Sequence, residues 1–143
     1  MHKLEVDVSG TMHVDATSRI DVTAKGYAIS RTTGNTTEGG AWSSRPDSFG
    51  AGGSYGSIGA VSDSANARTN AVYGDYADPD DWGSGGTGAA GGGLVRLTAN
   101  TLQLDGQILA TGGFGGYGIS FAGGSGGGIY VAVGTLTGNG LIK

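Results

Sequence analysis

Cysteine is absent from this sequence of 143 residues, and lysine and arginine together number only 8. Without cysteine the chain can form neither disulfides nor a thiolate metal site. The basic residues are scattered singly, so the sequence offers no basic patch for nucleic acid or an anionic membrane. No apolar run approaches the roughly 20 residues of a membrane span, so membrane insertion is not expected. The strand pattern starts directly after Met1-His2-Lys3, without a signal sequence, and we expect a mature or excised segment.

Proline is also scarce, with 2 residues, whereas glycine supplies 32. The glycines follow no three-residue period, which excludes collagen. Hydrophobic residues make up 37% of the chain and the formal net charge is only −4, a composition that favours a collapsed chain over a disordered one. At this length we expect one domain spanning residues 1–143.

An internal repeat is the main structural signal. Residues 95–108 match residues 129–142 without a gap at an offset of 34 residues, so that Val95 corresponds to Ile129 and Leu102 to Leu136. The opening segment fits the same template with small insertions, through the aliphatic residues Leu4, Val6, Val8, Met12, Val14, Ile20 and Val22. The sequence therefore contains three related copies.

Each copy alternates apolar and polar residues with period two, as half-buried strands do. Turn-forming pairs separate the strands: Ser9-Gly10, Asn100-Thr101, Asp105-Gly106 and Asn139-Gly140. This pattern predicts an all-β fold, a short right-handed parallel β-helix (β-solenoid) of about three coils, with matching residues stacked on one another. The predicted boundaries are coil one at 3–26, a glycine- and aromatic-rich insertion at 27–93, coil two at 94–128 and coil three at 129–143. A β-sandwich is the alternative, because it too has short strands separated by turns.

The insertion carries both tryptophans and four of the six tyrosines. A second glycine-rich excursion covers residues 111–124. Loops above about 15 residues are usually functional or disordered, and the aromatic content favours a packed excursion. We expect parts of it to be extended or polyproline-II-like, running along the flank of the coils, because glycine permits close backbone approach.

Several strings resemble segments of very large bacterial surface proteins: Val14-Asp15-Ala16-Thr17-Ser18-Arg19-Ile20-Asp21-Val22, Ser54-Tyr55-Gly56, Tyr73-Gly74-Asp75, Trp82-Gly83-Ser84-Gly85-Gly86 and the Gly-Gly-x-Gly-Gly-like runs before strands. The chain is similar in style to glycine-rich β-helical adhesins and passenger domains, and the resemblance spans most of it. The resemblance implies an extracellular or cell-surface location, a structural or adhesive role and no cofactor. It supplies no catalytic motif.

The acidic segment 75–81 is the best candidate for chemistry. Four carboxylates lie close together in sequence, a density that suits an oxygen-ligand Ca²⁺ site: Asp75, Asp78, Asp80 and Asp81. The alternative is that the aspartates and Pro79 simply shape a solvated turn before Trp82. Carboxylate pairs also serve glycosidases, so a polysaccharide-degrading enzyme is a further, weaker hypothesis for Asp78, Asp80 and Asp81. We identify no catalytic residue and expect no enzyme.

The predicted end coils carry no polar cap, so they should expose apolar residues and unpaired strand edges. We therefore expect a structural module that associates with itself or with adjoining coils, building a surface fibre or an adhesin stalk. The expected contact residues are Leu4, Val6, Ile129, Val131 and Ile142 on the coils and Trp42, Tyr55, Tyr73, Tyr76 and Trp82 in the insertion. The alternative is a calcium-dependent adhesin whose aromatic residues stack on a glycan.

Overall fold

The computed structural model describes residues 1–37, 50–61, 67–116 and 122–143, and these residues form an all-β structure. The strands are β1 (Lys3–Val14), β2 (Arg19–Asp21), β3 (Leu94–Leu104), β4 (Gln107–Leu109), β5 (Gly128–Thr137) and β6 (Leu141–Ile142). Within the described ranges the sole helical element is the single turn η1 (Thr33–Asn35). No helix of this part of the chain is long and apolar enough to cross a membrane.

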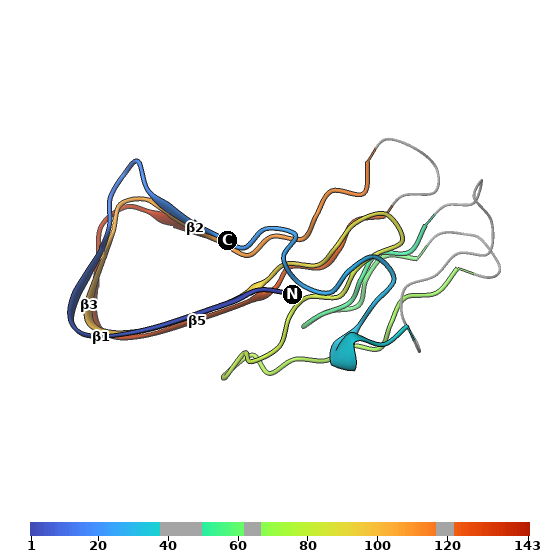
Figure 1. Ribbon diagram of the computed structural model, residues 1–143, viewed down its shortest axis with the longest axis horizontal. Helices are drawn as coiled ribbons and strands as arrows, with labels where there is room; N and C mark the ends of the chain where they lie inside the picture. Colours follow the sequence, from blue (N-terminus) through green and yellow to red (C-terminus); the bar gives the residue numbers. More distant parts are fainter. Residues whose placement is uncertain (38–49, 62–66, 117–121) are drawn as a thin grey trace.

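The strands form two parallel sheets of three strands each, in the orders β1-β3-β5 and β2-β4-β6. Val95 pairs with Leu4 on one side and with Ile129 on the other, so the predicted register is confirmed. Figure 1 shows the three strands of the first sheet superposed on one another, with β2 on the other arm of a wedge. Sandwiches of the immunoglobulin type are antiparallel, so the parallel pairing does not favour the sandwich alternative. Neither sheet closes on itself, and β1, β2, β5 and β6 are edge strands.

Two of the predicted turns are instead parts of strands. Ser9-Gly10 lies within β1 and Asn100-Thr101 within β3, so the first strand of each repeat is longer than the sequence indicated. The β1–β3 register shifts between Val8 and Thr11, because β1 has an extra residue there and forms a bulge. The bends at Asp105-Gly106 and Gly138-Asn139 do separate strands, close to the turns that the sequence predicted.

One apolar core lies between the two sheets. Its most buried members come from the middle strands β3 and β4: Val95, Leu97, Leu102, Leu104 and Ile108. The edge strand β1 contributes the buried Val14, whereas Val6, Ile20 and Val131 of the edge strands pack against the core but are only partly buried. The core is therefore complete in the middle of the stack and incomplete at both of its ends.

The described parts of the glycine-rich segments form a layer on one side of the sheets, at the right of Figure 1. These parts belong to none of the six strands, yet backbone hydrogen bonds join residues of different segments. Gly91 N–H donates to the Tyr27 carbonyl (2.9 Å), Gly83 N–H to the Gly92 carbonyl (2.9 Å) and Gly92 N–H to the Ser125 carbonyl (2.9 Å). These bonds satisfy buried backbone groups that no ladder serves.

Close approach explains why the layer needs glycine. A Cβ built on Gly92 would lie 2.8 Å from the Ala110 carbonyl carbon and 2.5 Å from Gly127 N. Only a residue without a side chain fits between those two backbones. The predicted packed excursion is thus a hydrogen-bonded layer of backbones.

The glycine layer buries polar as well as apolar side chains. Its buried polar residues are Thr32, Ser54, Asn70 and Ser84, and its buried apolar residues are Tyr27, Ala51 and Ala89. The Asn70 amide accepts from Ser54 N–H (2.7 Å) and donates to Ser54 O (3.1 Å), which ties segment 50–61 to segment 67–74. Ser84 Oγ lies 2.9 Å from Thr32 Oγ1. Side-chain hydrogen bonds therefore join the segments of this half of the molecule.

Candidate functional site

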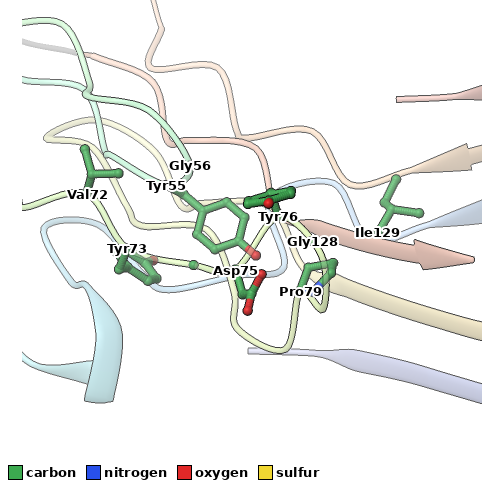
Figure 2. A pocket seen from close by; sticks show the side chains of 11 residues that line it. Tyr55, Gly56, Val72, Tyr73, Asp75, Tyr76, Pro79, Gly128 and Ile129 are labelled. Carbon is green, nitrogen blue, oxygen red and sulfur yellow. The ribbon is translucent and has the colours of Figure 1, made fainter.

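A pocket of about 380 Å³ lies where segment 72–79 meets the start of β5. Figure 2 shows Tyr55 and Asp75 near its centre, with Tyr76 above them and Pro79 and Ile129 beside them. Tyr76 is wholly exposed. The pocket therefore combines aromatic rings, a carboxylate and an opening to solvent.

The Tyr55 ring is fixed by its neighbours. It meets Tyr73 edge to face, with the ring centroids 5.2 Å apart. Gly74 has a φ of 93° and no side chain, and a Cβ there would lie 2.5 Å from Tyr55 Cε2. Gly56 N–H donates to Tyr73 O (2.9 Å), which holds the two segments together. In the sequence Tyr73-Gly74-Asp75, the first residue packs its ring on Tyr55, the glycine leaves space for the Tyr55 ring, and the third residue supplies a carboxylate to the same pocket.

Tyr73 and Trp82 are engaged within the chain. The Tyr73 hydroxyl donates to Trp82 O (2.6 Å) and lies 2.8 Å from Ser84 Oγ. Trp82 Nε1 donates to His2 O (2.9 Å), and its ring packs edge to face on Tyr27 at 5.9 Å. Tyr73 thus joins two parts of the insertion, and Trp82 joins the insertion to the start of the chain, while Trp42 lies outside the described residues.

The four aspartates of the acidic segment have different environments. Asp75 Oδ1 accepts from Ala77 N–H (2.8 Å), and Asp78 Oδ1 lies 2.7 Å from Arg96 Nη2. Asp81 accepts from the Tyr27 hydroxyl (2.7 Å) and is partly buried, whereas Asp75, Asp78 and Asp80 are exposed. Among the described residues, no three His, Asp or Glu side chains are grouped so that they could hold a metal ion. These contacts favour the interpretation of a shaped turn, and calcium binding stays a prediction.

Arg96 was not among the sequence-based candidates, although it anchors this turn. Its Nη1 donates to Pro79 O (2.7 Å), and its guanidinium lies 4.4 Å from the centroid of the Tyr130 ring. Arg96 stands between Glu5 and Tyr130 on the outward row of the first sheet. The repeat register alone could have predicted that Arg96 lies between Glu5 and Tyr130. It could not have predicted that the acidic turn packs against Arg96.

Tyr27 gives the chain a predictable response to alkaline pH. Burial, with a further contribution from its hydrogen bond to Asp81, raises the pKa of Tyr27 from 10.0 to about 12. The folded chain holds this proton more tightly than the unfolded chain does. The stability that Tyr27 contributes is therefore complete below about pH 10 and is lost as the pH rises toward about 12. We expect the urea midpoint to fall over this window.

The control is Tyr27→Phe, in which no phenol remains to ionise at this position. Its urea midpoint should fall less steeply between pH 10 and 12 than that of the original chain, measured by circular dichroism. Equal slopes for the two proteins would show that Tyr27 titrates in the folded chain as it does when unfolded.

Among the described residues, no further strand pairs with either end of the strand stack. Leu4 and Val6 on β1 and Ile129 and Val131 on β5 are half-buried, and Ile142 on β6 is 43% exposed. At the β1 end a hollow of about 400 Å³ opens between β1 and β2, lined by Leu4, Ile20 and Val22 among others. The structure thus places the predicted coil contact residues at the two open ends.

Comparison with protein-family models, curated proteins and solved structures finds no match.

Proposed function

We propose that the chain is a non-enzymatic structural module built as a right-handed parallel β-solenoid of about three coils. The support is the repeated register, in which Leu4, Val95 and Ile129 lie side by side, as do Ile20, Ile108 and Ile142. Parallel strands joined by crossovers are right-handed in nearly all proteins, which supports the assigned hand. A solenoid of this size is near the minimum for stability, so further coils would add missing burial.

The proposed role is to extend a surface structure by end-to-end stacking of strands. The main support is the difference in exposure between two paired residues. Leu102 is fully buried in the middle strand, whereas its partner Leu136 on β5 is 55% exposed. An edge strand presents unpaired N–H and C=O groups together with this apolar row. Adding a coil there would bury both.

The two ends are complementary in register. Continuing the parallel pairing beyond β5 places Leu4 of a second copy beside Ile129, and continuing it beyond β6 places Ile20 beside Ile142. Such a contact joins different surfaces and does not close on itself, so it produces a filament. The hollow between β1 and β2 would receive the exposed aliphatic residues of β5 and β6.

An extracellular surface fibre or adhesin stalk is the setting that we propose. Its basis is the resemblance to glycine-rich surface proteins, together with a fold held by backbone hydrogen bonds and one apolar core. The partners would be further copies of the chain or adjoining coils of the same kind.

Sedimentation velocity and electron microscopy test this proposal. We expect the purified chain to form elongated species whose length grows with concentration. Val131→Lys should reduce this association at least about tenfold, because a charge would have to be buried at the β5 edge. The matched control Ile58→Lys lies on the glycine layer, where Ile58 is 73% exposed, and should associate normally.

Circular dichroism would confirm that both variants keep their strands. A chain that stays strictly monomeric at high concentration would contradict self-association. Association that Val131→Lys leaves unchanged would show that the β5 edge is not the contact surface.

A further inference from the structure

The pocket beside β5 holds a polar group without a partner. Among the side chains that the structure describes, the Tyr55 hydroxyl is the buried one that makes no hydrogen bond. It lies close to Gly128, where a Cβ would be 3.0 Å from the hydroxyl oxygen. A buried hydroxyl without a partner costs free energy, so a ligand that bonds to it would be stabilised.

The lining of the pocket has the chemistry that recognises a cation. Three tyrosine rings, Tyr55, Tyr73 and Tyr76, surround the space together with the Asp75 carboxylate. Aromatic faces attract ammonium groups, and carboxylates pair with them. Among the described residues, no lysine or arginine lines this pocket. A neutral ligand would gain from the rings but not from the charge.

Carboxylates of the acidic segment act on the Tyr55 hydroxyl. Burial raises the pKa of Tyr55, and the carboxylates of Asp81, Asp80 and Asp75 raise it further. The guanidinium of Arg96 is engaged by Asp78 and Pro79 O. Asp75 Oδ1 serves the backbone of its own turn, and among the described residues Oδ2 accepts no hydrogen bond.

We infer that this pocket binds an alkylammonium group, with the ammonium paired to Asp75 and Tyr55 and the alkyl part among Tyr73, Tyr76 and Ile129. The cavity of about 380 Å³ is within the range of small-molecule sites. Most of its walls come from the insertion, and Gly127 with the first residues of β5, Gly128 and Ile129, completes them.

The strand register supplies one source of such a group. Lys3, Leu94 and Gly128 occupy equivalent positions on β1, β3 and β5. In the stacking proposed above, Lys3 of the next copy would lie beside Gly128, at the rim of the pocket. Within one chain Lys3 pairs with Glu5 at 2.7 Å, but both side chains are exposed, and such a pair is weak enough to exchange. This assignment of the source rests on the proposed function, whereas the pocket itself does not.

The first experiment uses n-butylammonium as the probe and n-butanol, of equal length and without charge, as the control ligand. We expect chemical-shift changes at Tyr55, Tyr73 and Asp75 with n-butylammonium and weaker binding of n-butanol by about tenfold. Asp75→Asn should weaken n-butylammonium binding by about tenfold, and Tyr55→Phe should weaken it severalfold. Asp7→Asn, on the outward row of β1, is the matched control and should change nothing.

The second experiment measures association of the chain with Lys3→Met, and with Arg31→Met on the glycine layer as control. Loss of about tenfold in association for Lys3→Met and for Asp75→Asn, but not for Arg31→Met, would assign Lys3 as the source. If n-butylammonium binds while Lys3→Met associates normally, the site stands and its ligand is a free organic cation.

The two proposals can fail separately. A chain that never associates but binds n-butylammonium through Asp75 would contradict the stacking and support the ammonium site. A chain that associates, ignores n-butylammonium and is unaffected by Lys3→Met would overturn the ammonium site and leave the stacking intact.

Discussion

Replacing Gly92 by alanine is expected to lower the free energy of unfolding by about 3 kcal/mol or more. The new Cβ would lie against the Ala110 carbonyl oxygen and 2.5 Å from Gly127 N, both of which belong to the backbone. The neighbours cannot rotate away as a side chain would, so the hydrogen bonds of the layer must break or shift. Among them are Gly92 N–H to Ser125 O and Gly127 N–H to Ala110 O. Urea denaturation followed by circular dichroism measures the loss.

Gly10→Ala is the matched control. Gly10 lies in β1, and a Cβ built there meets nothing within 4 Å. The free energy of unfolding of Gly10→Ala should stay within about 0.5 kcal/mol of that of the original chain. If Gly92→Ala were as mild as Gly10→Ala, the close packing of backbones would not be the reason for the glycine-rich composition.

Truncating Leu102 to alanine is the second change with a large expected effect, about 3 kcal/mol within a range of 2–5. Leu102 is fully buried, with β1 on one side and β5 on the other. Removing its side chain loses apolar burial and leaves a cavity that two parallel sheets cannot readily close. The same urea experiment measures the change.

Leu136→Ala removes the same atoms from the same ladder, but at its open end. Because Leu136 is 55% exposed, the cost in the isolated chain should be below about 1 kcal/mol. In an assembled sample the cost should rise toward that of Leu102→Ala, because the next coil would cover the site. Equal effects of the two truncations in the monomer would mean that the β5 end is not open.

The strand order and register could be predicted from the sequence because they depend on spacing alone. The constant offset that relates Val95 to Ile129 and Leu102 to Leu136 leaves one in-register parallel pairing, and the structure has that pairing. The prediction of turns at Ser9-Gly10 and Asn100-Thr101 was wrong. Ser9-Gly10 forms a bulge in β1, and Asn100-Thr101 continues β3 opposite it, because the neighbouring strands keep their pairing on both sides.

For the glycine layer, the sequence predicted a packed segment but not its backbone contacts. High glycine content indicated close backbone approach, but glycine has no side chain by which sequence could show which segments meet. The bonds from Gly83, Gly91 and Gly92 to distant carbonyls are set by the way that the two sheets position the ends of each loop. The partners of the acidic segment could not be predicted from the sequence either. Asp78 forms an ion pair with Arg96, and Asp81 accepts a hydrogen bond from Tyr27.

By itself, then, the sequence determined the all-β character, the parallel register and the residues that form the apolar rows, since each of these follows from periodicity along the chain. Only the tertiary structure decided that Tyr55, Asp75 and Gly128 share one pocket, and that Tyr73 and Trp82 bond within the chain while Tyr76 stands free. The physical reason is that these contacts join segments of no fixed spacing. Their partners are selected by shape and hydrogen bonding once the sheets have formed.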